Sequence, residues 1–246
     1  MTLLRRQKLI IILLVFYWPA IFILTHIPMV SIPMWVIQTN TNDKILHYLV
    51  YLILVFLLWL AINPNEKVNW GRTSVWWVLL VVVWYGVFDE WLQSYVGRSC
   101  DIADFLADLA GTLTGLILLS FFSFWSASLV LTGAAIFILT NFMQANPDLL
   151  PTANVVFHLV GYAFFSLLWT RYMCQLLPAK APQLKWLIGA SAIPIVFLLS
   201  VETFSVVAGN GLEPLCVIAS VAAITAVIST IYMIALFGQN FAEKMP

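Results

Sequence analysis

Charge is the scarcest feature of this sequence. Of its 246 residues only 9% are charged, whereas 63% are apolar, and the mean hydropathy is +0.99. A soluble globular domain does not reach this apolar content, so much of the protein surface must face lipid. The eleven basic and eleven acidic residues cancel. The concentrated basic face that a nucleic-acid partner requires is therefore absent, and we expect no such partner.

Cysteine is also rare. The three cysteines, Cys100, Cys174 and Cys216, form no CxxC pair and no His-linked spacing, which argues against a zinc or thiol redox site. We expect free buried thiols, with a Cys100–Cys216 disulfide as the alternative. The first apolar run follows three basic residues as in a signal peptide, but no small-residue cleavage site follows it. We therefore interpret it as a retained first span.

Long apolar runs dominate what remains. A bilayer core of about 30 Å requires about 20 apolar residues in helical form. Eight stretches meet this need, so the sequence predicts an all-α polytopic membrane helix bundle with about eight transmembrane helices. We expect these helices over residues 8–26, 44–62, 73–90, 103–124, 128–142, 155–175, 186–206 and 214–237.

The few charges are distributed unevenly along these spans. With both termini on the cytoplasmic side, nine of the eleven basic residues fall in inner loops or ends, and only Lys44 and Arg98 fall outside. Basic residues are retained on the cytoplasmic side, which supports this orientation. Nine of the eleven acidic residues then lie at or near the outer face. The acidic stretch between the third and fourth spans is thus predicted to face outward.

The two halves of the sequence resemble each other. The string AIFILT occurs at residues 20–25 and again at 135–140. Polar residues also recur in register, which favours a duplication into two four-helix repeats, residues 1–126 and 127–246, running in parallel about a pseudo-twofold axis along the membrane normal. The second copy has lost most acids, so the first is expected to carry the site. The counterparts of His47, Tyr51, Glu90 and Asp101 are His158, Tyr162, Glu202 and Glu213.

Helical spacing places the polar residues of the first half on common faces. Asp43, His47 and Tyr51 are four residues apart and share one face. Asp101, Asp104 and Asp108 share another, which continues into Gly111 and Gly115, a small-xxx-small surface for close helix packing. A carboxylate at the membrane boundary must face protein, water or a partner. These faces are therefore expected to meet in one site.

A histidine beside several carboxylates is typical of sites for general acid–base catalysis or for proton-coupled transport. The alternative is a purely structural role, in which hydrogen bonds among these residues hold the helix ends together. Carboxylate oxygens also suit Mg²⁺ or Ca²⁺, but no loop has a coordination pattern, so we expect no metal. The candidate catalytic residues are His47, Glu90 and Asp104. The candidate substrate-binding residues are Asp43, Lys44, Tyr51, Asp89, Gln93, Arg98, Asp101 and Asp108.

These motifs resemble the VanZ-like family of bacterial membrane proteins. In that family a segment DK..H...Y is followed by YG..DE..Q...GR..D..D...N..G...G, and here DKILHYLVY and residues 85–115 match it. The match covers roughly residues 10–125, and the remainder only weakly. Asp108 stands where the family usually has Asn. The resemblance implies the bacterial cytoplasmic membrane and a cell-envelope role, since the founding member is associated with low-level teicoplanin resistance.

The leading hypothesis is an outward-facing site that binds or modifies an envelope lipid or a lipid-linked precursor. In this reading Glu90 is the acid or base, His47 is its partner, and Arg98 contacts the headgroup. The alternatives are a proton-coupled transporter or flippase of a lipid or small solute, and a non-catalytic scaffold for other envelope proteins. No cofactor is expected in any of the three, and the residues leave open whether the site is catalytic.

Overall fold

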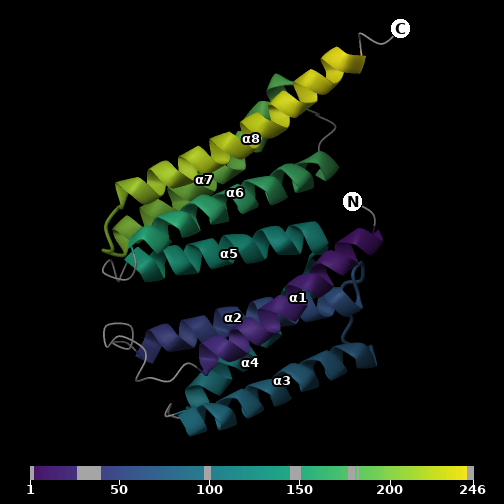
Figure 1. Ribbon diagram of the computed structural model, residues 1–246, viewed down its shortest axis with the longest axis vertical. Coiled ribbons are helices and arrows are strands. Elements are labelled where there is room, and N and C mark those ends of the chain that lie inside the picture. The colour runs from purple at the N-terminus through teal and green to yellow at the C-terminus, as the bar shows by residue number, and fades with distance from the viewer. Residues whose placement is uncertain are drawn as a thin grey trace. The chain divides into compact units, whose positions relative to one another are not determined.

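The structure is a computed structural model that describes residues 3–26, 40–96, 101–144, 151–176, 181 and 183–242. The described residues form eight α-helices and one short 3-10 helix, and none of them lies in a strand (Figure 1). All eight α-helices are long and apolar enough to cross a membrane. The predicted all-α, multi-pass class is therefore confirmed, while the parallel repeat arrangement stays a prediction.

Contacts between residues divide the chain into a first unit, Met1–Ala127, and a second unit, Ser128–Pro246. The helices of the first unit are α1 (Leu3–Thr25), α2 (Asn40–Ile62), α3 (Thr73–Gln93), the 3-10 turn η3 (Ser94–Val96) and α4 (Ile102–Phe121). Helix α5 (Phe124–Gln144) begins at the boundary and is followed by α6 (Pro151–Leu176), α7 (Leu184–Val207) and α8 (Pro214–Ala242).

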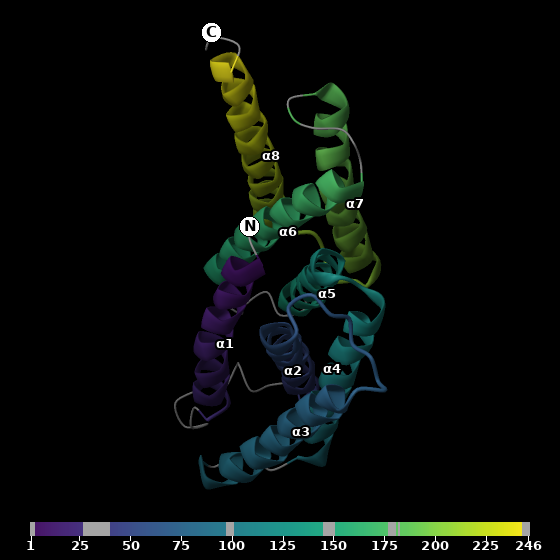
Figure 2. The same ribbon diagram turned by 90° about the vertical axis from the view of Figure 1, so that its right-hand side faces the viewer.

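Helix α2 forms the centre of the first unit, between α1 and α4 (Figure 2). Its side chains Tyr51, Leu54 and Val55 are completely buried. Helix α4 approaches it closely, because a Cβ atom added to Gly111 would collide with the carbonyl oxygen of Tyr48, and one added to Gly115 would collide with Val55. The small-xxx-small surface predicted from the sequence thus packs against α2.

The loop between α2 and α3 lies at the end of the first unit opposite to the predicted site residues. The indole of Trp59 donates to the carbonyl oxygen of Glu66 at 2.9 Å, and the backbone of Val68 donates to that of Leu119 at 3.0 Å. Glu66 and Arg72 form an exposed ion pair. These contacts hold α2, α3 and α4 in register, which fixes how their opposite ends meet.

In the second unit, α6, α7 and α8 enclose a core around the buried side chains of Tyr162, Met173 and Trp186. Helices α7 and α8 are joined by a turn in which Gly209 and Gly211 have φ angles of +85° and +82°. A side chain rarely adopts these values, so glycine is required at both positions. The turn brings the start of α8 beside the end of α7.

Candidate functional site

The predicted polar residues of the first unit gather where α2 begins, α3 ends and α4 begins. Helix α2 begins at Asn40, earlier than its apolar run, so that Asp43 and Lys44 lie on the helix with His47. Helix α4 begins after Asp101, whose side chain accepts a hydrogen bond from the backbone of Ala103 as an N-cap. We call this group the polar cluster; it consists of Asp43, Lys44, His47, Asp89, Glu90, Gln93, Asp101, Asp104 and Asp108.

Most of the polar cluster is shielded from solvent. Six of its side chains belong to residues that are at most 5% exposed: His47, Asp89, Glu90, Gln93, Asp104 and Asp108. A buried carboxylate loses its hydration and must recover that free energy from hydrogen bonds or opposite charge. The contacts inside the cluster therefore decide what it can do.

Lys44 joins α2 to the start of α4. Its Nζ atom lies 2.9 Å from Oδ2 of Asp101 and 3.0 Å from Oδ1 of Asp104, so one ammonium bridges two carboxylates. The Lys44 ammonium, together with the N-cap bond from Ala103, lowers the pKa of the Asp101 carboxyl group below its ordinary value. Arg98, which the sequence predicts to contact the headgroup, lies outside the described residues, and Lys44 holds both acids.

This arrangement predicts that the protein loses thermal stability as the pH falls into the acid range, a part of the pH profile that we call the acid limb. A carboxylate whose pKa is lowered by folding stabilises the protein fully above its unfolded pKa, about 3.9, and loses this contribution as the pH falls through the folded value. We expect Asp101→Asn, which keeps an N-cap acceptor but removes the charge, to flatten the loss of thermal stability below about pH 4. Unfolding temperatures measured across pH in detergent test this.

The matched control for this pH profile is Glu66→Gln, which removes an exposed carboxylate from the far end of the unit. It should retain the acid limb of the wild-type protein. Superimposable profiles for Asp101→Asn and the wild-type protein would contradict the assignment.

His47 on α2 is hydrogen-bonded to Asp108, which lies one helical turn after Asp104 on α4. Nδ1 of His47 lies 2.9 Å from Oδ1 of Asp108, and both residues are at least 96% buried. Since the carboxylate can only accept, the protonated Nδ1 donates. The sequence paired His47 with Glu90 instead. The geometry places Glu90 nearby, but gives the hydrogen bond to Asp108.

Glu90 links the end of α3 to the start of α4. Its Oε2 atom accepts a bond of 3.3 Å from the backbone of Asp101, and its Oε1 atom is buried with no hydrogen-bond partner within the described ranges. The adjacent Asp89 accepts from the side-chain amide of Gln93 at 2.9 Å and lies 3.7 Å from Nδ1 of His26. The end of α3 therefore contributes two carboxylates with different surroundings.

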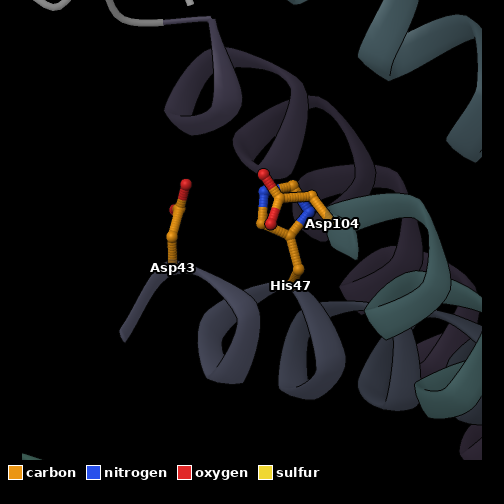
Figure 3. Close-up of side chains that lie close together, drawn as sticks. All are labelled: Asp43, His47 and Asp104. Atoms are coloured by element: carbon orange, nitrogen blue, oxygen red, sulfur yellow. The ribbon is translucent and has the colours of Figure 1, made fainter. Parts of the chain in front are cut away.

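Two overlapping groups in the cluster have the donors of a cation site. One consists of Asp43, His47 and Asp104, and the other of His47, Glu90 and Asp108; in each, one ligand atom per residue lies within 4.8 Å of the others. Figure 3 shows Asp43 and His47 extending in the same direction from α2, with the carboxylate of Asp104 beside the imidazole. The first group combines two residues of α2 with one of α4, and the second combines one residue each of α2, α3 and α4, which is why no loop motif revealed them.

An apolar groove of about 650 Å³ lies along α1 and α3. It is lined by Leu14, Val15, Trp18, Pro19, Phe22, Tyr85 and Phe88. Phe22 connects the groove with the polar cluster, because its ring stacks on His26 at 4.2 Å and His26 approaches Asp89. The sequence did not predict this groove, since the exposed apolar residues of both helices looked like ordinary lipid-facing positions.

Tyr51, a predicted site residue, lies beside Asp108 of the polar cluster. It is fully buried, and its ring centre is 5.9 Å from that of Tyr85 in the wall of the groove. The hydroxyl groups of Tyr51 and Tyr85 are buried without a hydrogen-bond partner among the described residues. Tyr51 therefore sits between the polar cluster and the groove rather than in the cluster itself.

The second unit contains a neutral counterpart of the cluster. Nδ1 of His158 lies 3.0 Å from Oγ of Ser220, which itself donates to the carbonyl oxygen of Cys216, so the histidine must donate to the serine. Nε2 of His158 then accepts from Thr140 at 3.4 Å. Both ring nitrogens are thus occupied in a chain of uncharged groups.

The two acids of the second unit that the structure describes, Glu202 and Glu213, also accept hydrogen bonds from neutral groups. Glu213 accepts from the side-chain amide of Asn154 at 2.9 Å, and Glu202 accepts from that of Gln144 at 3.2 Å. This network holds fewer acids than the polar cluster, although Oε1 of Glu202 is also buried without a hydrogen-bond partner among the described residues. The first unit is therefore the better candidate for a functional site, as the sequence predicted.

A protein-family model described as VanZ/LLP1 matches residues 5–124. This range includes the complete polar cluster and both helices of the groove. Neither the curated proteins nor the solved structures gave a match.

Proposed function

The part of this chain that carries the polar cluster, residues 5–124, belongs to the VanZ/LLP1 family, and from that premise we propose that the chain binds or modifies a lipid or lipid-linked precursor of the bacterial cell envelope. The polar cluster receives the headgroup on the outer side of the cytoplasmic membrane. The apolar groove along α1 and α3 receives an acyl or isoprenoid chain. The continuity of groove and cluster through Phe22 and His26 carries this proposal.

The dimensions and lining of the groove suit a hydrocarbon chain. Its walls are aromatic and aliphatic side chains, and ligand sites of a few hundred Å³ with few polar groups are typical of apolar ligands. Phe88 and Val15 in its lining are 51% and 61% exposed, so a lipid can enter sideways from the bilayer. A headgroup attached to that chain would lie next to Asp89.

The charge of the cluster favours a particular kind of headgroup. In the described part of the cluster, six carboxylates face one lysine, Lys44. A bare phosphate would be repelled by this surplus, whereas an amine or a hydroxyl-rich sugar would donate hydrogen bonds to it. We therefore favour an aminated or glycosylated lipid over a simple anionic one.

The buried pair of His47 and Asp108 supplies the means for a chemical step. Asp108 fixes the orientation of the imidazole and stabilises it when protonated, as an orienting acid does in hydrolytic triads. His47 could then exchange a proton with the headgroup, and Glu90, with its unpaired Oε1 in the described structure, could hold a second. Binding requires only the cluster and groove, whereas modification requires this pair as well.

Filling the groove tests lipid binding directly. Val15→Trp places a large ring in the groove, so we expect at least about a tenfold loss of co-purified lipid, measured by mass spectrometry of the protein extracted in mild detergent. Ile12→Trp is the matched control, because Ile12 lies on the same helix at 56% exposure but does not line the groove. Equal lipid content in both variants and the wild-type protein would refute the groove as the binding site.

A further inference from the structure

Three buried side chains from three helices converge in the polar cluster. His47 on α2, Glu90 on α3 and Asp108 on α4 each place a ligand atom within 4.8 Å of the other two. Two atoms that bind one transition-metal ion at about 2.1 Å lie about 3.4 Å apart in a tetrahedral arrangement. Small side-chain rotations would therefore bring all three within bonding distance of a single ion.

Unpaired oxygen atoms mark this group as incomplete. Oε1 of Glu90 and Oδ2 of Asp108 are buried, and neither has a hydrogen-bond partner in the portion of the chain that the structure describes. The two residues are only 4% and 2% exposed. Buried carboxylate oxygens without a partner are costly and uncommon in folded proteins. A cation bound by this group would offset the surplus negative charge and could give a buried carboxylate oxygen a partner.

The overlapping group of Asp43, His47 and Asp104 is a weaker candidate. Oδ1 of Asp104 is already held at 3.0 Å by the ammonium of Lys44, with which a metal ion would compete. Asp43 is only partly buried. In the group with Glu90 and Asp108 all three residues are buried, and Oδ1 of Asp108 is bonded to His47, which is itself a member of the group, so the cation should prefer it.

We propose that His47, Glu90 and Asp108 bind one divalent transition-metal ion, with Zn²⁺ as the best match. One imidazole and two carboxylates are donors that zinc and its neighbours accept, whereas Mg²⁺ and Ca²⁺ prefer oxygen ligands alone. Three protein ligands leave a position for water or for an atom of a bound molecule. Lipid binding in the groove does not depend on this ion, whereas the proton exchange proposed for His47 and Glu90 requires the cluster without the ion, because a group bound to a metal ion cannot exchange protons.

The second unit provides a built-in comparison. Its counterparts are His158, Glu202 and Ser220, so one carboxylate is missing, and both nitrogens of His158 already have partners. Glu202 is buried to the same degree as Glu90, at 5% against 4%. A carboxylate-to-amide change at Glu202 therefore controls for the general effect of altering a buried acid.

Metal binding to the full-length protein tests the proposal. The protein is purified in mild detergent, stripped with EDTA, exposed to Zn²⁺, and analysed by elemental mass spectrometry and calorimetry. We expect one tightly bound Zn²⁺ per chain, at least about tenfold weaker binding in Glu90→Gln, and wild-type binding in Glu202→Gln. Mg²⁺ and Ca²⁺ at the same concentration should bind far more weakly.

Asp108→Asn provides a second variant in case Glu90→Gln fails to fold, which circular dichroism would reveal. It should also lose at least about tenfold in Zn²⁺ affinity, because an amide is a poor zinc ligand. Absence of Zn²⁺ from the wild-type protein, or equal binding by the wild-type protein and the folded variant, would overturn the proposal. Lipid content measured on the same samples separates this result from the groove hypothesis.

Discussion

Replacing Gly111 with alanine should destabilise the first unit by more than about 3 kcal/mol, beyond the usual range for overpacking. The added Cβ would collide with the carbonyl oxygen of Tyr48 and come within 3.1 Å of the backbone nitrogen of Leu52. Both are backbone atoms of α2, so no side-chain rotation can relieve the contact. The two helices would have to separate, which would loosen the packing that holds the polar cluster together.

The control for this variant is Gly86→Ala on α3. A Cβ at Gly86 meets its nearest neighbour, Oδ2 of Asp108, at an ordinary 3.5 Å. Because alanine favours a helix by about 1 kcal/mol over glycine, Gly86→Ala should be neutral or slightly stabilising. Equilibrium unfolding in mixed detergent micelles measures both effects. Similar stability of the two variants would mean that α2 and α4 are not packed as closely as the structure indicates.

The class of the fold was readable from the sequence because apolar run length reports directly on membrane spans. All eight predicted spans correspond to helices. Their ends were less well predicted: α2 begins at Asn40 rather than residue 44, and α3 continues to Gln93 rather than ending at residue 90. Hydropathy marks the apolar part of a helix, whereas hydrogen bonding continues through polar turns beyond it. At α2 this difference matters, because the extra turn carries Asp43.

The sequence indicated which polar residues lie at the same helix ends, but it did not indicate their partners. Helical spacing placed Asp104 and Asp108 on one face of α4, since it depends only on the geometry of one helix, whereas Asp101 precedes the helix as its N-cap. Which residue on α2 faces each acid depends on the rotation and register of two helices, which spacing does not contain. His47 was therefore paired with Glu90 in the sequence interpretation, whereas the structure bonds it to Asp108.

The same limit applies to helix packing. The spacing of Gly111 and Gly115 predicted a surface for close approach, but the sequence could not name the partner, which is α2. The groove was beyond prediction for a related reason. Its walls come from α1 and α3, which are separated along the chain by an entire helix, and nothing in either apolar run indicates that the two lie together.

Replacing His47 with alanine is expected to cost about 3–5 kcal/mol of stability, because it leaves Asp108 buried without its hydrogen-bond donor. The nearby acids Glu90 and Asp104 cannot replace the histidine, since they add charge of the same sign. The double variant that also carries Asp108→Ala should recover a large part of the loss, because no unpaired carboxylate then remains at this position. The resulting coupling energy between His47 and Asp108 should exceed about 2 kcal/mol.

The second unit supplies the reference for this double-mutant cycle. His158 and Ser220 form a neutral hydrogen bond of 3.0 Å at an equally buried position. Their coupling energy should therefore be about 1 kcal/mol, the value typical of uncharged pairs. Both cycles are measured by equilibrium unfolding in micelles with EDTA present, which excludes any contribution from a bound cation. A stronger coupling for His47 and Asp108 would identify the first pair as ionic in character. Equal couplings would instead mean that it behaves as a neutral structural bond, and the acid–base role proposed for His47 would then be untenable.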